Sequence, residues 1–143
     1  MKRTAITGVA SYVPEDVLNN EEIETMMDTT SEWIVTRSGI SERRIMKDKD
    51  KAAGFMAAEA AKKLLAKKGI DPLEIDLIIV ATVSPDHQYP ATANIVADMI
   101  GAKNAWGFDV QAACSSFIYA LQTGSKFIES ETHKKVIVIG SDK

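Results

Sequence analysis

The sequence has a single cysteine, no long apolar run and no large excess of charge of either sign. Cys114 therefore cannot form an internal disulfide or supply a thiolate metal cluster, and only two histidines accompany it. The 17 basic and 20 acidic residues nearly balance, which argues against a nucleic-acid partner. No apolar run approaches the roughly 18 residues of a membrane-spanning helix, and the amino terminus lacks the apolar stretch of a signal peptide. These absences predict a cytoplasmic protein without a membrane partner, in which Cys114 either packs or performs chemistry.

The residues that are present have the composition of one compact folded domain, with 45% hydrophobic and 26% charged residues. Continuous apolar runs at residues 77–80 and 136–139 are typical of strands covered on both faces in a parallel sheet. Apolar residues at helical spacing predict a helix over residues 52–68. The remaining expected elements are strands at 4–9 and 105–110, and helices at 21–27, at 93–100 and from about residue 114. This order predicts an α/β fold with crossover helices.

Three local features refine this prediction. Asn19, followed by Glu22 three residues later, resembles a helix-starting cap. Residues 28–51 lack a long regular pattern, so they are expected to form a functional or mobile loop. The last strand has no helix after it to cover it, which indicates a piece of a larger structure. The inward stripe of the helix that follows Cys114 is predicted to be Phe117, Ile118 and Leu121.

Cys114 stands where an apolar strand turns into a helix, in the segment FDVQAACSSFIYAL at residues 108–121. Unpaired backbone N–H groups at a helix start favour a thiolate and a developing oxyanion. This effect is at best about 2 kcal/mol, so a strong nucleophile also needs a helper, normally histidine. His133 is expected at the far end of the same helix and His87 in a loop, and neither fits that role. Position alone leaves a catalytic thiol and a small buried side chain both open.

Four segments resemble, in order and spacing, the β-ketoacyl-acyl-carrier-protein synthase III condensing enzymes of type II fatty acid synthesis. They are DTTSEWIVTRSGISERR at 28–44, ATVSPDHQYPATA at 81–93, FDVQAACSSFIYAL at 108–121 and VIVIGSD at 136–142. The resemblance implies a thiolase-like α/β fold, with helices on both faces of a mixed, mostly parallel sheet. Residues 1–143 would be the amino-terminal repeat of a duplicated five-layer αβαβα architecture. The second repeat, with a catalytic histidine and asparagine, would be absent, so the fragment alone is expected to be inactive.

The resemblance also implies a reaction and its partners. An acyl-CoA primer would be loaded on Cys114 as a thioester and condensed with malonyl-acyl carrier protein, with loss of CO2, to give a 3-oxoacyl product. Coenzyme A would be part of a substrate, and neither a cofactor nor a metal is expected. Thr29, Trp33 and Arg37 would bind coenzyme A. Tyr89 would shape the acyl pocket across a homodimer.

Some positions depart from the family pattern, and alternatives remain. Ser116 stands where glycine or an alanine-glycine pair is usual after the cysteine, Val83 replaces a common threonine, and Tyr89 replaces a frequent phenylalanine, so the primer range is open. Another thiolase-fold condensing enzyme, such as a hydroxymethylglutaryl-CoA synthase or a secondary-metabolite ketosynthase, is one alternative. A flavodoxin-like binding domain in which Cys114 is merely packed is the other.

Overall fold

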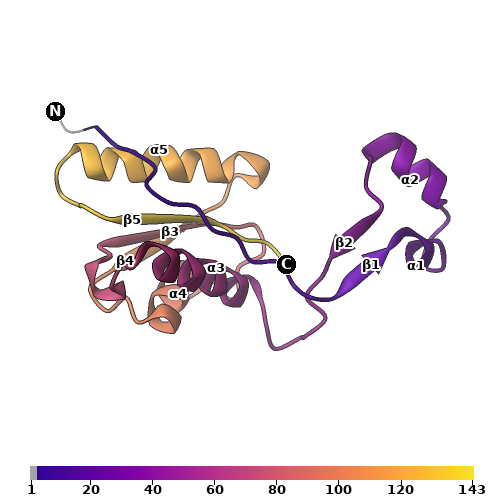
Figure 1. The fold of residues 1–143 in the computed structure, drawn as a ribbon, viewed down its shortest axis with the longest axis horizontal. Helices are drawn as coiled ribbons and strands as arrows, with labels where there is room; N and C mark the ends of the chain where they lie inside the picture. The colour runs from indigo at the N-terminus through magenta and orange to yellow at the C-terminus, as the bar shows by residue number, and fades with distance from the viewer. Residues whose placement is uncertain (1–2) are drawn as a thin grey trace. The chain divides into compact units, whose positions relative to one another are not determined.

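The computed structural model describes residues 3–143 and divides the chain into two compact units (Figure 1). Unit 1 combines the amino-terminal segment up to Tyr12 with Asp50–Lys143, and unit 2 is Val13–Lys49. The sequence had predicted one compact domain, without a separate unit between its first segment and its first long helix. Among the described residues, no helix is both long and apolar enough to cross a membrane.

Unit 1 is built on a sheet of three parallel strands in the order β4-β3-β5. The strands are β3 (Leu77–Ala81), β4 (Trp106–Val110) and β5 (Val136–Gly140). All five residues of the central strand β3 are buried. The predicted strands at 77–80, 105–110 and 136–139 are therefore confirmed to within one residue. Because the strands are parallel, their carboxyl ends lie at one edge of the sheet.

Helices cover both faces of this sheet (Figure 1). The helices α3 (Ala53–Lys68) and α4 (Thr92–Ile100) lie on one face and α5 (Ser116–Glu129) on the other. Alternate side chains of β3 serve the two faces. Ile78 and Val80 belong to the core cluster with α3 and α4, whereas Leu77 and Ile79 belong to the cluster with α5. The prediction of buried strands between two helical layers is confirmed.

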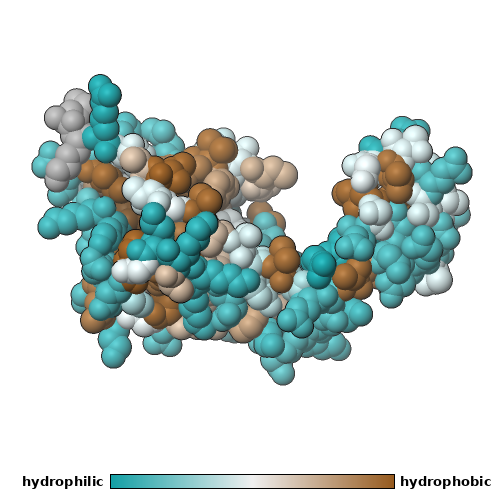
Figure 2. Space-filling view, viewed as in Figure 1, coloured by the Kyte–Doolittle hydropathy of each residue, from teal (hydrophilic) through white to brown (hydrophobic). Residues whose placement is uncertain are grey.

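The inward face of α5 differs from the prediction. Its buried residues are Ser116, Ala120 and Gly124, while Phe117 and Ile118 are 41% and 63% exposed. The small residues let the helix approach the sheet closely, since a Cβ atom on Gly124 would lie 3.2 Å from side-chain atoms of Val136 and Val138. Apolar side chains consequently lie at the surface of α5, as the brown atoms in Figure 2 show. At Gly124 the approach of the helix to β5 leaves no room for a larger side chain.

The strand predicted at residues 4–9 is absent. These residues are not paired with any strand, and a cavity of about 680 Å³ is lined by residues 4–10 together with β5, α3 and α5. A ladder requires backbone hydrogen bonds to a neighbouring strand, and none joins residues 4–9 to a strand in the described part of the chain. Side chains hold the segment instead: Thr4 Oγ1 donates to the Ser125 carbonyl at 3.1 Å, and Lys67 Nζ donates to the Val9 carbonyl at 3.3 Å.

Unit 2 contains a short antiparallel ladder and two helices. The strands β1 (Val17–Asn19) and β2 (Glu42–Arg44) pair with each other, and α1 (Asn20–Glu24) and α2 (Ser31–Ser38) lie between them in the chain. The predicted cap at Asn19 is confirmed as a capping box with Glu22, although α1 ends earlier than the predicted helix. The prediction of an irregular loop was wrong, because α2 and β2 lie within residues 28–51.

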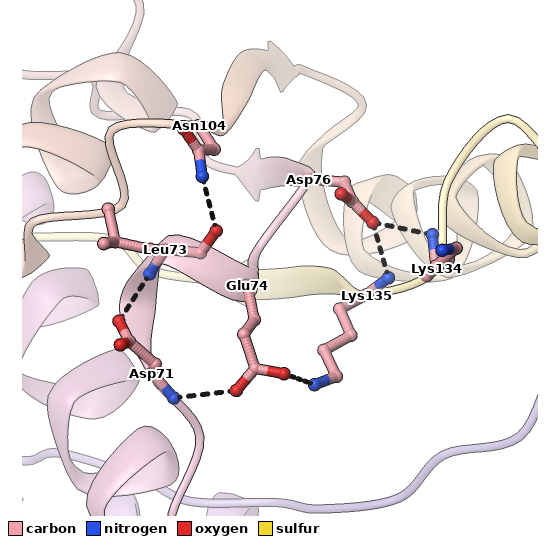
Figure 3. Close-up of polar contacts among 7 residues, drawn as sticks. All are labelled: Asp71, Leu73, Glu74, Asp76, Asn104, Lys134 and Lys135. Atoms are coloured by element: carbon pink, nitrogen blue, oxygen red, sulfur yellow. Dashed lines mark hydrogen bonds and ion pairs between the residues drawn. The ribbon is translucent and has the colours of Figure 1, made fainter.

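Carboxylates at the amino ends of β3 and β5 bind the connections that enter these strands (Figure 3). Asp76 Oδ2 accepts the backbone N–H groups of Lys134 and Lys135 at 2.7 and 2.9 Å. Glu74 closes a capping box at the short helix η1 (Pro72–Glu74) and pairs with the Lys135 ammonium group. The Asn104 amide donates to the Leu73 carbonyl at 2.7 Å. These contacts fix the end of unit 1 that lies away from the carboxyl ends of the strands.

This network should make stability fall in acid. Burial raises the pKa of Asp76, but hydrogen bonds from the Lys135 and Lys134 backbones and the charges of His133 and Lys134 outweigh it and hold the pKa below 3.8. A carboxylate with a lowered pKa in the folded state stabilises above its unfolded pKa, and this contribution is lost as pH falls through the folded pKa. We expect Asp76→Ala to lower the free energy of unfolding by about 1.5 kcal/mol at neutral pH, because two N–H groups lose a charged acceptor.

Urea denaturation at about pH 7 and about pH 2.5 measures this effect. The difference between the unsubstituted protein and Asp76→Ala should shrink at the lower pH, because the contribution of the ionised carboxylate is lost as pH falls through its lowered folded-state pKa. A matched control is Asp98→Ala, because the exposed Asp98 carboxylate accepts no hydrogen bond in the described chain. A difference that is the same at both pH values would contradict the role assigned to the ionised Asp76.

Candidate active site

The candidate site lies at the carboxyl ends of the three parallel strands. The loops that follow β3, β4 and β5 all start from this edge of the sheet. Ligands of parallel α/β sheets bind at this edge, because loops rather than ladders expose functional groups there. The chemistry-bearing residue among these loops is Cys114.

Cys114 lies in a tight turn between β4 and α5. The turn is a 3-10 helix, η2 (Ala113–Ser115), in which the Ser115 N–H donates to the Ala112 carbonyl at 3.1 Å. Ala113 has φ of 48°, a left-handed conformation that is uncommon for a residue other than glycine. The Cys114 side chain is exposed. The alternative in which this cysteine is a small buried side chain is therefore wrong for this structure.

No hydrogen bond joins either histidine to Cys114 among the residues that the structure describes. His133 accepts a hydrogen bond at Nε2 from Trp106 Nε1 at 2.9 Å, and its Nδ1 lies 2.8 Å from Thr132 Oγ1. Trp106 is the first residue of β4, whereas Cys114 follows the last one, so His133 is at the opposite end of the strand. His87 is exposed in the loop after β3.

Asp142 organises the start of the loop after β3. One of its carboxylate oxygens accepts hydrogen bonds from the Val83 N–H at 2.7 Å, from Thr82 Oγ1 at 3.0 Å and from Ser84. Burial raises the pKa of Asp142, but the hydrogen bonds from Val83, Thr82 and Ser84 outweigh it and hold the pKa below 3.8. The loop after β5 is thus tied, through an ionised carboxylate, to the loop that carries Tyr89.

Two more carboxylates anchor the same loop further along. Asp86 Oδ2 accepts the Gly54 N–H at the start of α3 at 2.7 Å. Asp109, within β4, accepts the Thr92 and Ala93 N–H groups at the start of α4 at 2.7 and 2.9 Å. Anionic side chains are favourable at helix amino termini.

Tyr89 lies between these two anchors and is 89% exposed. Its ring therefore projects from a loop whose ends are fixed.

Sequence reasoning missed Asp86, Asp109 and Asp142 as organisers of the site. A signal existed for Asp109, since it interrupts the otherwise apolar strand at residues 105–110 and a buried carboxylate needs donors. For Asp86 and Asp142 the sequence carries no comparable signal, because both follow strands in polar segments where an aspartate is ordinary. Their partners are 32 and 58 to 60 residues away, and only the fold brings them together.

The residues expected to bind coenzyme A gather on α2 in unit 2. Thr30 caps this helix by accepting the Trp33 N–H at 3.1 Å, and Thr29 directly precedes the cap. The Trp33 indole is 57% exposed, and the Arg37 guanidinium carbon lies 5.7 Å from its ring centroid. An exposed indole next to a guanidinium offers a stacking surface and a positive charge. The alternative of Trp33 as an ordinary core aromatic does not fit its exposure.

The expected site residues thus form two groups. Thr29, Trp33 and Arg37 belong to unit 2, while Tyr89 and Cys114 belong to unit 1. Across residues 3–143, no group of three or more histidine, cysteine, aspartate or glutamate residues is arranged to hold a metal ion.

Known proteins match this chain closely. The β-ketoacyl-[acyl-carrier-protein] synthase III of Chlorobium phaeovibrioides is 57% identical over 97% of the chain and 42% of the relative's length. The crystal structure of 3-oxoacyl-[acyl-carrier-protein] synthase III from Aquifex aeolicus superimposes with a TM-score of 0.88 at 46% identity, and covers 93% of this chain and 42% of that one. The family model of 3-oxoacyl-[acyl-carrier-protein (ACP)] synthase III matches residues 108–143, which include Cys114.

The chain belongs to the synthase III family. It corresponds to the amino-terminal portion of a synthase III, and it spans about two fifths of the length of the curated relatives that it matches, 42% for the relative named above. The predicted thiolase-like α/β fold is confirmed by the superposition on synthase III structures. The flavodoxin-like alternative is therefore wrong.

A further solved structure belongs to a neighbouring type of enzyme. The priming β-ketosynthase of the R1128 polyketide pathway superimposes on this chain with a TM-score of 0.88 at 39% identity, over 93% of this chain and 40% of that one. The alternative of a secondary-metabolite ketosynthase thus shares the fold, and the distinction depends on the substrate.

Proposed function

We propose that the protein is an acyltransferase that initiates type II fatty acid synthesis. The Cys114 sulfur attacks the carbonyl carbon of an acyl-CoA primer, the coenzyme A thiol leaves with the cysteine proton, and a thioester remains on the enzyme. Malonyl-acyl carrier protein then loses CO2, and the resulting carbanion attacks the thioester to give a 3-oxoacyl product and free the cysteine. The observation that carries this proposal is the exposed thiol in the turn after β4, within a chain that is 57% identical to a synthase III.

The proposed reaction also needs a catalytic histidine and asparagine in addition to Cys114. A thiolate is both a good nucleophile and a good leaving group, which suits a two-stage acyl transfer. In the described chain no histidine is hydrogen-bonded to Cys114, and His133 is bonded to Trp106 instead. We therefore assign residues 1–143 to an amino-terminal thiolase-like domain and the catalytic histidine and asparagine to a second repeat. The 143 residues alone would not complete the reaction.

For the substrates we assign Thr29, Trp33 and Arg37 to the nucleotide end of coenzyme A, with the adenine stacked on the Trp33 indole. The exposure of this ring and its neighbouring guanidinium support the assignment. Tyr89 would border the acyl chain, and its exposed ring suits a contact with a second protomer. The assembly that we propose is a cytoplasmic homodimer that uses malonyl-acyl carrier protein and no cofactor.

Transfer of label from acyl-CoA to the complete protein tests this function. We expect radiolabelled acetyl-CoA to label Cys114 faster than longer acyl-CoA thioesters, and malonyl-acyl carrier protein to release the label as a 3-oxoacyl product. Faster labelling from longer primers would favour the alternative of a secondary-metabolite ketosynthase. The polyketide priming ketosynthase, at 39% identity, is an example of that type among the similar structures. Absence of labelling from every acyl-CoA would refute the proposal.

The nucleotide site gives a separate prediction. Trp33→Ala should raise the KM for acetyl-CoA about tenfold, because stacking of a base on an aromatic ring contributes about 1 to 3 kcal/mol. The kcat should change less than the KM, since the ring lies on the nucleotide and makes no contact with the reacting atoms. Steady-state kinetics of the complete protein measures both.

Val35→Ala on the same helix is the matched control, because Val35 is also exposed. This variant should leave the KM unchanged. Equal KM values for Trp33→Ala and Val35→Ala would remove Trp33 from the coenzyme A site.

A further inference from the structure

Ser116 is a buried hydroxyl in the turn that carries Cys114. It is 3% exposed and is the first residue of α5. Its Oγ accepts the Ala112 N–H at 2.6 Å and donates to the Ala113 carbonyl at 2.7 Å. One side chain thus bonds to the backbone on both sides of the peptide unit that joins Ala112 to Ala113, three to four residues before its own position at the start of the helix.

These two bonds bracket an unfavourable backbone conformation. Ala112 has φ of −154° and ψ of 37°, and Ala113 has a left-handed φ of 48°. A residue with a Cβ atom adopts a left-handed conformation at a cost, and it persists only where the surroundings hold it. The Ser116 hydroxyl stabilises this conformation, because a change in the Ala113 backbone would move the Ala112 N–H or the Ala113 carbonyl away from the Ser116 Oγ. The direction in which the Cys114 side chain leaves the turn depends on this same pair of residues.

We propose that Ser116 is a positioning residue for Cys114, an inference that rests on the proposed acyl transfer. Its hydroxyl locks the turn so that the thiol points toward the incoming thioester carbonyl. It touches the backbone of Ala112 and Ala113 and makes no contact with the substrate. A smaller residue at position 116 leaves the Ala112 N–H without this acceptor and lets the turn sample other conformations.

Ser115, the neighbouring residue, provides a control that distinguishes the positioning role of Ser116 from a general effect of removing a hydroxyl near Cys114. Ser115 is exposed and makes no side-chain cap at the start of α5, so its hydroxyl has no comparable hold on the turn. Ser115→Ala is therefore the matched control for Ser116→Ala, with the same atom removed one residue away. Ser116→Gly is a second variant, and the resemblance of the segment to a pattern with glycine at this place indicates that the fold accepts it.

The test compares two reactions of the same thiol in the complete protein. Acetyl transfer from acetyl-CoA needs a directed thiol, so Ser116→Ala and Ser116→Gly should lower its kcat about 3- to 10-fold, as expected for one lost hydrogen bond. The KM for acetyl-CoA should stay within about twofold, because the coenzyme A residues are unchanged. Iodoacetamide approaches an exposed thiol from many directions, so alkylation of Cys114 should change by less than about twofold. Ser115→Ala should change neither reaction.

The results of the two assays distinguish failure of the Ser116 positioning role from failure of the proposed acyltransferase function. Unchanged acetyl transfer in both Ser116 variants would overturn the positioning role and leave the acyltransferase proposal standing. A parallel fall in acetyl transfer and alkylation would also overturn it, since the loss would then come from a disordered or hidden thiol. If the unsubstituted protein is alkylated but never acetylated, the proposed function fails, and the positioning role fails with it.

Discussion

Cys114→Ser should abolish formation of the acyl-enzyme. A serine hydroxyl remains protonated at neutral pH and is a far weaker nucleophile than a thiolate, and no histidine is hydrogen-bonded to position 114 in the described chain. We expect the rate of label transfer from acetyl-CoA to fall by ~1,000-fold or more, as for loss of a covalent nucleophile. Mass spectrometry of the labelled protein, followed by peptide mapping, locates the thioester. The assignment within this chain is unambiguous, because Cys114 is its only cysteine.

The control for this variant is its stability. The Cys114 side chain is exposed, so replacement by serine should change the free energy of unfolding by less than about 0.5 kcal/mol. A loss of labelling in a protein of unchanged stability then reports chemistry. Labelling at the unsubstituted rate would remove Cys114 as the nucleophile and leave the family membership without a catalytic assignment.

Gly107→Ala should cause a large loss of stability. Gly107 lies in β4, paired with Ile78 of β3, and faces the start of α4. A Cβ atom at this position would lie 2.7 Å from both the Ala93 Cβ and the Ile78 carbonyl oxygen. Neither atom can move without displacing a strand or a helix, so we expect a loss of about 3 kcal/mol, at the upper end of overpacking costs. Urea denaturation of the purified protein measures it.

Gly101→Ala is the comparison for Gly107→Ala. Gly101 ends α4 with φ of 76°, and an added Cβ would meet no atom within 4 Å. The cost there is limited to the left-handed conformation, about 1 kcal/mol. If the loss for Gly107→Ala does not exceed the loss for Gly101→Ala, close contact of β4 with α4 is not what requires glycine in this strand.

The sequence predicted the parts of unit 1 in which local patterns and tertiary packing agree. The apolar runs of β3 and β5 are long enough to be buried on both faces, and the helical spacing over residues 52–68 corresponds to α3. The cap at Asn19 was equally visible, because a capping box involves residues only three apart. Such features need no knowledge of distant residues.

The predictions that failed concern segments whose structure depends on distant partners. Residues 4–9 have the composition of a strand, yet they make no backbone hydrogen bonds to any strand of the described chain. The apolar residues Phe117 and Ile118 suggested the inward face of α5, but Ser116, Ala120 and Gly124 are the buried residues of this helix, while Phe117 and Ile118 are largely exposed. The helix α2 has eight residues and none of them is buried, so no periodic apolar stripe marked it.

The sequence by itself determined the order of most elements of unit 1, the turn that presents Cys114 and, through resemblance, the family. These features depend on short-range patterns and on family motifs, both of which can be recognised in the sequence without knowledge of the fold. Only the tertiary structure decided which face of α5 is buried, that Asp86, Asp109 and Asp142 hold the loop of Tyr89, and that His133 contacts Trp106. Each of these pairings joins residues 16 or more apart in the chain. Such contacts follow from the packing of strands and helices, which a local pattern does not encode.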